Sequence, residues 1–178
     1  AYYATLLDEA KNYKKAVSIL ASAVEKFPTN TQLRFFLGTM YDRTGNRKET
    51  VNQLNKVLEQ DKDHVQALNY LAYTYADTGG NFELAHRALQ LQPTDGYILD
   101  TVGWIHFKRG EMEQAIKYLE AAYKAKSDEA IIAEHLGDAY LRFQMWQKAQ
   151  KMYFRASQLE NDDEHRDKIQ EKIANIES

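Results

Sequence analysis

Histidine and carboxylate side chains are the residues of this sequence whose types could do chemistry. One local group, Glu134, His135 and Asp138, falls within about one helical turn and offers ligand types that bind metals. The same spacing is typical of a charged helix surface, which is the interpretation we favour. The histidines are otherwise scattered along the chain, at positions His64, His86, His106, His135 and His165.

Other signs of catalysis are missing from the sequence. It contains no cysteine, which excludes disulfides, thiol catalysis and zinc-thiolate sites. Asp61 and Asp63 lack the glycine and glutamate spacing of a calcium loop, and neither a phosphate-binding glycine loop nor a nucleophile elbow occurs. Function must be argued from a site, and the sequence shows none for catalysis or for a metal. We therefore predict a chain that is not an enzyme and has no metal or cofactor.

Composition limits the class of partner. The 178 residues are 44% hydrophobic and 28% charged, which is typical of a globular chain with a sizeable core. The net charge of -3 gives no basic surface for nucleic acid and no polybasic membrane patch. No apolar run is long enough to cross a bilayer, so we expect no direct membrane span.

A short pattern recurs along the chain: an aliphatic residue, a small residue and, three places later, a ring. It occurs at Leu37-Gly38 with Tyr41, Leu71-Ala72 with Tyr75, Val102-Gly103 with His106, and Leu136-Gly137 with Tyr140. The intervals are 34, 31 and 34 residues. A regular interval in this range is typical of a solenoid, in which each unit buries its apolar face against its neighbours. We expect His106 to fill the core position that tyrosine takes elsewhere.

The interval predicts a repeat array over 1–163 followed by a capping helix over 164–178. Apolar residues three and four apart predict two helices in each unit. The second helix of the third unit is about one turn short. Either the shortening is real and the array changes pitch locally, or residues are missing from the sequence. Asn161 and Glu164 resemble a capping box at the start of the last helix. The predicted units are 1–30 (truncated), 31–64, 65–95 (shortened), 96–129 and 130–163.

The spacing Leu-Gly-x-x-Tyr, then Ala-x-x-x-Leu/Tyr-x-x-Ala, then Pro resembles the signature of tetratricopeptide (TPR) repeats. The resemblance covers 1–163, although the family's first-helix tryptophan is absent and His106 and Thr50 depart from the pattern. It implies an all-α, right-handed α-α superhelix with a C-terminal capping helix. It also implies a non-catalytic scaffold that binds a protein or peptide in its concave groove.

Three segments, 67–73, 95–104 and 133–138, are similar to the carboxy-terminal repeats of proteobacterial TPR proteins. Some of those are outer-membrane lipoproteins that bring substrates to a carboxyl-terminal processing protease in the periplasm. This likeness implies a periplasmic or outer-membrane-associated protein whose partner is a protease or its substrate; without it, the chain would be cytoplasmic. Ala1 falls partway through a repeat, so we expect an excerpt of a longer protein.

First helices of stacked hairpins line the concave side in this family, which gives a predicted groove. Its exposed rings would supply binding energy, although Trp104 and Phe107 could instead pack under the neighbouring repeat as core. Five carboxylates would make this surface acidic, with basic residues along one edge: Asp42, Asp77, Asp100, Glu134 and Asp138. Such a surface would suit an apolar, basic peptide. The alternative is that these are solvated charges that keep the chain soluble. The predicted partner-binding residues are Phe35, Asn69, Tyr73, Tyr97, Asp100, Trp104, Phe107, Glu134 and Asp138.

An alternative function is that of a structural spacer or self-association module. The apolar edge formed by Tyr2, Tyr3, Leu6 and Leu7 would stack on another copy or on upstream repeats if it is exposed. The sequence therefore predicts a protein-binding scaffold, with self-association through the amino-terminal edge as its rival.

Overall fold

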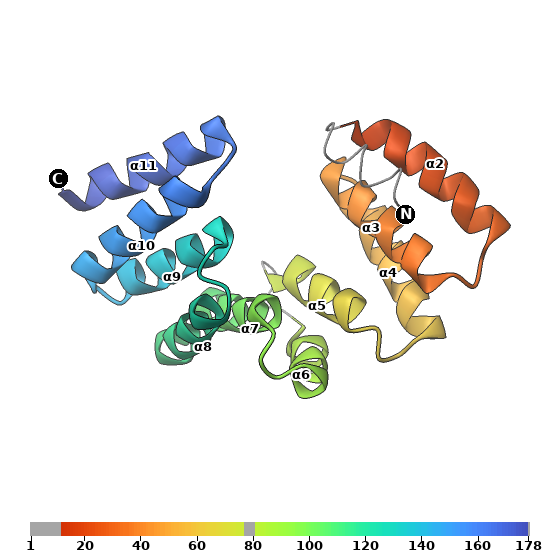
Figure 1. Cartoon of the computed structure of the whole chain (residues 1–178). Helices are drawn as coiled ribbons and strands as arrows, with labels where there is room; N and C mark the ends of the chain where they lie inside the picture. Colours follow the sequence, from red (N-terminus) through yellow and green to blue (C-terminus); the bar gives the residue numbers. More distant parts are fainter. Residues whose placement is uncertain (1–11, 77–80, 178) are drawn as a thin grey trace. The chain divides into compact units, whose positions relative to one another are not determined.

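Every regular element in the part of the chain that the structure describes is an α-helix (Figure 1). The structure is a computed structural model that describes residues 12–76 and 81–177. No strand occurs in these two ranges, which confirms the all-α prediction. The helices are α2 (Tyr13–Lys26), α3 (Thr31–Arg43), α4 (Arg47–Gln60), α5 (Val65–Thr74), α6 (Phe82–Leu91), α7 (Gly96–Lys108), α8 (Met112–Ala125), α9 (Ala130–Arg142), α10 (Trp146–Leu159) and α11 (Asp163–Glu177).

Side-chain caps and turn residues set where the helices begin. The side chains of Asn30, Asn46 and Asn81 each accept a hydrogen bond from the backbone N–H three residues on, and Asp95 caps α7. Gly45, in the turn between α3 and α4, has a positive φ of 75°, which suits glycine. α6 has 10 residues where α4 and α8 have 14, so the shortened second helix is present.

The chain forms two compact units, residues 1–71 and 72–178, with the boundary inside α5. The first unit has a small core between α2 and α3, built from Ala16, Leu20, Leu37 and Met40. The apolar edge at residues 2–7 lies outside the described residues. The self-association alternative therefore stays a prediction.

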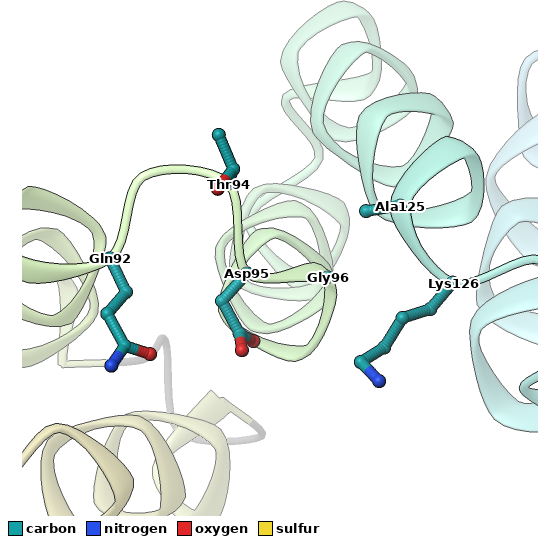
Figure 2. Close-up of a pocket in the computed structure, with 6 residues that line it drawn as sticks. All are labelled: Gln92, Thr94, Asp95, Gly96, Ala125 and Lys126. Carbon is teal, nitrogen blue, oxygen red and sulfur yellow. The ribbon is translucent and has the colours of Figure 1, made fainter.

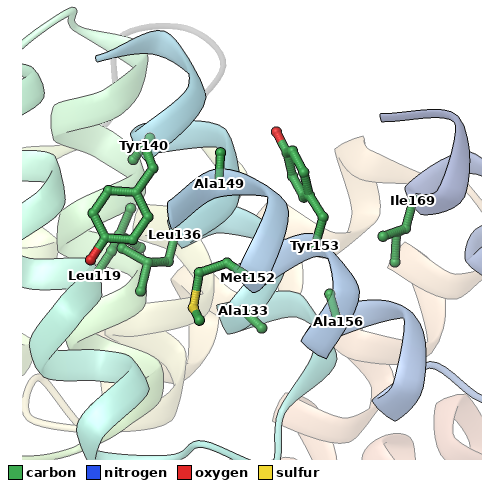
Figure 3. Close-up of a cluster of buried hydrophobic side chains, with 10 residues drawn as sticks. Leu119, Ala133, Leu136, Tyr140, Ala149, Met152, Tyr153, Ala156 and Ile169 are labelled. Carbon is green, nitrogen blue, oxygen red and sulfur yellow. The ribbon is translucent and has the colours of Figure 1, made fainter. Parts of the chain in front are cut away.

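The second unit holds the larger buried cluster, which lies between α8, α9, α10 and α11 (Figure 3). Glycines allow the paired helices to approach closely: a Cβ on Gly137 would lie 2.7 Å from the Tyr153 ring, and one on Gly103 would lie 2.7 Å from Leu119. The small residue of the recurring pattern therefore marks close packing inside the α7–α8 and α9–α10 hairpins. The cluster comprises Leu119, Ala133, Leu136, Ala139, Tyr140, Ala149, Met152, Tyr153, Ala156 and Ile169.

The predicted capping box at the start of the last helix is wrong. The Asp162 carboxylate, rather than Asn161, accepts the hydrogen bond from the backbone N–H of His165. Glu164 instead pairs with Lys168 on the helix surface. The cap moves by one residue because the backbone N–H groups of Asn161 and Asp162 are both held by the Glu160 side chain.

Candidate functional site

The recurring pattern places Phe35, Asn69, Asp100 and Glu134 at equivalent positions, each two residues before the aliphatic residue. The structure corrects the prediction that these side chains line an open groove, because Phe35, Asp100 and Glu134 are buried and Asn69 is half-buried. Phe35 and Asp100 contact the first helix of the following hairpin, and Glu134 contacts α11. A side chain at this position fills the space between successive first helices, so only a matching partner there makes a polar residue tolerable.

The partners differ from one repeat to the next. In the first unit the Phe35 ring meets the edge of the Tyr70 ring with centroids 6.2 Å apart. In the second unit the Asp100 carboxylate lies 2.9 and 3.0 Å from Nδ1 of His135. Glu134 is 2.8 Å from both His165 and Lys172 of α11. The same position is therefore apolar in one repeat and an ion pair in another.

A row of rings lies beside the Asp100–His135 pair and is the best-defined candidate site of the second unit. The Trp104 ring stacks on His135 with centroids 4.0 Å apart and on Phe107 at 4.7 Å. Tyr73, near the end of α5, lies 6.1 Å from His135. We call Tyr73, His135, Trp104 and Phe107 the ring row. It brings together three of the predicted partner-binding residues.

The ring row is partly open to solvent. Tyr73 is 41% exposed, whereas Trp104 and Phe107 are half-buried and His135 is buried. Trp104 also packs on the core cluster of α5, α6 and α7, and Phe107 packs on the α9–α10 cluster. Each of these two side chains therefore has both a core contact and an exposed part, so neither sequence alternative describes it fully.

Cations lie against two rings of the ring row. The Lys108 ammonium lies 4.9 Å from the Trp104 ring centroid, and the Arg142 guanidinium lies 5.2 Å from that of Phe107. The carboxylates that were expected to make this surface acidic are occupied internally: Asp100 pairs with His135, and Asp138 accepts from Tyr153 and Lys172. Among the described residues of the second unit, the expected acidic surface is therefore wrong, and the ring row carries the exposed positive charge of Lys108 and Arg142.

Two further acidic positions, Asp42 and Asp77, were predicted for the groove. Asp42 belongs to the first unit, where it accepts a hydrogen bond from the Tyr70 hydroxyl at 2.7 Å. Asp77 lies outside the described residues. Lys108 and Arg142, which lie against rings of the ring row, are both exposed.

Tyr97, also predicted to bind the partner, makes its contacts away from the ring row. Its hydroxyl donates to Glu129, and the Lys126 ammonium lies 4.4 Å from its ring. The hydrogen bond to Glu129, together with burial, raises the pKa of Tyr97 to about 12. Although it is 43% exposed, Tyr97 therefore belongs to the junction between α7 and the α8–α9 loop.

An open hollow lies beside that junction (Figure 2). Its charged groups are already in use: the Asp95 carboxylate accepts from the backbone N–H groups of Tyr97 and Ile98, and the Lys126 stem packs against Gly96. The hollow therefore offers no set of groups for catalysis. Its lining residues are Gln92, Thr94, Asp95, Gly96, Ala125 and Lys126.

The side chains considered for metal binding point in different directions. His135 pairs with Asp100 on α7, whereas Glu134 and Asp138 face α11. Within residues 12–76 and 81–177, no group of three or more metal-ligating side chains converges. His106 is buried between Phe82 and Tyr118, as its core position predicts.

The contact of α11 with α9 depends on charge. Burial raises the pKa of Glu134, but hydrogen bonds from Lys172 and His165 and their positive charges lower it more, so this pKa lies below its usual range. Burial lowers the pKa of Lys172, but the hydrogen bonds to Asp138 and Glu134 and their negative charges raise it by more than burial lowers it. The pKa of Lys172 therefore lies above its usual range. Both shifts keep the groups ionised near neutral pH.

Sequence reasoning missed two parts of this site. The sequence suggests His135 only as a metal ligand, and it suggests the cations only at an edge of an acidic groove. The signal that was available is the separation of 35 residues between Asp100 and His135, which is repeated between Phe35 and Tyr70 and between Phe107 and Arg142.

In the described part of the chain, no helix is long and apolar enough to span a membrane.

Comparison with known proteins places the chain in a family. Profiles described as tetratricopeptide repeat match residues 9–72 and 103–162, which together are well over half of the chain. The TPR repeat-containing protein MJ1428 of Methanocaldococcus jannaschii is 35% identical over 80 residues. The match covers 44% of this chain and only 14% of that protein.

Solved structures share the fold at low sequence identity. TTC0263, a TPR protein of Thermus thermophilus, superposes with a TM-score of 0.82 at 14% identity, covering 98% of this chain and 95% of that one. A chain of the APC/C hetero-tetramer Cut9–Hcn1 has a TM-score of 0.88 at 14% identity, covering 98% and 35%. These matches confirm the α-α solenoid class, and the chain belongs to the tetratricopeptide repeat family.

Proposed function

We propose that the chain is a protein-interaction scaffold whose ring row binds a peptide segment of a partner protein. The observation that carries the proposal is the half-open stack of Tyr73, His135, Trp104 and Phe107 on first helices. Exposed aromatic side chains anchored by packing beneath them supply much of the energy of many interfaces. The family is one of scaffolds, which supports binding rather than catalysis.

The geometry suggests the chemistry of the bound segment. Lys108 and Arg142 lie over the rings, and their side chains can donate hydrogen bonds to a carboxylate. Apolar side chains would pack on Trp104 and Phe107. A segment that combines apolar and acidic residues therefore fits the ring row better than the basic peptide that the sequence suggested.

A narrower version of the proposal rests on the resemblance to proteobacterial lipoproteins. In this version the chain is part of a periplasmic adaptor, and the segment bound belongs to a processing protease or to its substrate. Cell fractionation of the full-length protein tests it: recovery in the outer-membrane fraction would support the adaptor version, and recovery in the cytoplasm would contradict it.

Site-specific photo-crosslinking tests the ring row itself. A photoreactive phenylalanine analogue at position 107 should crosslink a partner in native extract, because Phe107 is half-buried beside exposed cations. The matched control places the analogue at Phe27, which is 60% exposed in the first unit and should give no specific product. Equal crosslinking from both positions would contradict the proposal.

A further inference from the structure

α10 carries two strongly exposed aromatic side chains away from the ring row. Trp146 is 52% exposed and Phe154 is 58% exposed. They lie eight residues apart, about two helical turns, and share one flank of α10 with Gln150. Exposed aromatic residues grouped on one helix flank are typical of an interaction surface.

The same flank of α8 shows what such a surface contacts inside the array. Met112 and Ile116, 34 residues before Trp146 and Gln150, are half-buried. Glu120, the equivalent of Phe154, accepts a hydrogen bond from the Tyr140 hydroxyl at 2.6 Å. The flank of α8 therefore faces the following hairpin, α9–α10.

α11 covers the end of the array only in part. It packs along α10, where the fully buried Ile169 joins the shared core, and it also reaches α9 through Lys172, which contacts Glu134 and Asp138. At the position 34 residues after Tyr140, α11 carries Ala174, which is exposed and has no ring to reach Phe154. Even with α11 packed on α10, Trp146 and Phe154 on this flank therefore stay exposed.

The charge of α10 sets the chemistry of what it can bind. The helix contains Lys148, Lys151 and Arg155 and no aspartate or glutamate, although the whole chain is acidic. Lys151 is exposed and lies between the two aromatic residues in sequence. Carboxylates on a partner would meet this charge without competition from acids of the same helix.

We propose that the α10 flank docks an acidic amphipathic helix of a partner protein. The helix would place apolar side chains on Trp146 and Phe154 and carboxylates near Lys151, and would lie on α10 as the following hairpin lies on α8. This site is separate from the ring row, and its partner helix would bind whether or not the ring row is occupied.

A labelled model peptide tests this proposal by fluorescence anisotropy. The probe is a helical peptide of about four turns with leucine on one face and glutamate elsewhere, and its counterpart has lysine in place of glutamate. The glutamate peptide should bind the whole chain, and Phe154→Ala should weaken binding by about tenfold, as truncating an interface anchor does. Lys151→Glu should weaken it as well, whereas Phe27→Ala, which removes an equally exposed phenylalanine elsewhere, should not.

Several results would overturn the proposal. Binding that is unchanged by Phe154→Ala and abolished by Trp104→Ala would assign the peptide to the ring row. Equal binding of the lysine peptide would contradict the role of charge. If vesicles of anionic phospholipid bind the chain through Trp146, the surface is a membrane contact. If light scattering shows dimers that Phe154→Ala abolishes, the occupant is a second copy of the chain. Because Phe154 is mostly exposed, folding of the variants should be unaffected, which circular dichroism checks.

Discussion

The Asp100 carboxylate and the His135 imidazole lie 2.9 Å apart, are both buried, and join α7 to α9 across 35 residues of sequence. His135 in turn supports Trp104, whose ring stacks on it at 4.0 Å. The buried pair therefore holds the ring row as well as the two hairpins. A polar contact that the hydropathy pattern places on the surface is part of the interior.

Removing one member of this pair should destabilise the second unit. Asp100→Ala should lower the free energy of unfolding by about 3 kcal/mol, because it leaves a buried imidazole without its partner. Urea unfolding measures the change, and Asp167→Ala, at an exposed position, is the control. In a double-mutant cycle with His135→Ala the two effects should be strongly non-additive; additive losses would show that the pair is not coupled.

The docking of α11 should depend on one lysine. Lys172→Met keeps much of the side-chain stem but removes the ammonium that bridges Glu134 and Asp138 at 2.8 and 2.7 Å. Amide hydrogens of α11 should then exchange faster, because local opening of the helix becomes easier. Lys168→Met is the matched control, since its pair with Glu164 is exposed. Equal exchange in both variants would contradict the assignment.

Acid should weaken the same contact. The pKa of Glu134 lies below its usual range in the folded chain, so its contribution to stability is present above the ordinary pKa of a glutamate and lost as pH falls through the lower folded value. Unfolding measured from pH 7 down to about 3 should show this loss. Glu134→Gln should be less stable at pH 7 and less sensitive to acid. If the variant lost as much unfolding free energy in acid as the wild-type chain does, the acid sensitivity would belong to other carboxylates.

Close packing inside the hairpins should make two glycines unequal. A methyl group added at Gly137 would lie 2.7 Å from the Tyr153 ring, which the Asp138 hydrogen bond holds in place. Gly137→Ala should therefore cost roughly 1–3 kcal/mol of unfolding free energy. Gly38→Ala, whose methyl would lie 3.2 Å from Leu54, should cost less. Thermal melting ranks the two, and the reverse order would contradict the packing described.

The extent to which the sequence predicts this structure depends on how local the signal is. Leu119 and Tyr153 lie at the helical spacing of the apolar residues around them, and both are fully buried. Asp100 and Glu134 could not be placed by spacing alone, because their burial depends on partners more than 30 residues away. The exposure of Trp146 and Phe154 could not be predicted either, because apolar spacing in a second helix indicates only the buried face of that helix.

Binding by the ring row is the central claim, and partner capture before and after its truncation tests it most directly. Wild-type chain and the Tyr73→Ala/Trp104→Ala variant are used to isolate partners from native extract, with circular dichroism to verify folding and Phe27→Ala as the control. Truncation of central anchors should reduce affinity by about 2 kcal/mol or more, roughly thirtyfold, for the partner that crosslinks at position 107. A folded double variant that captures this partner at wild-type affinity would contradict the claim.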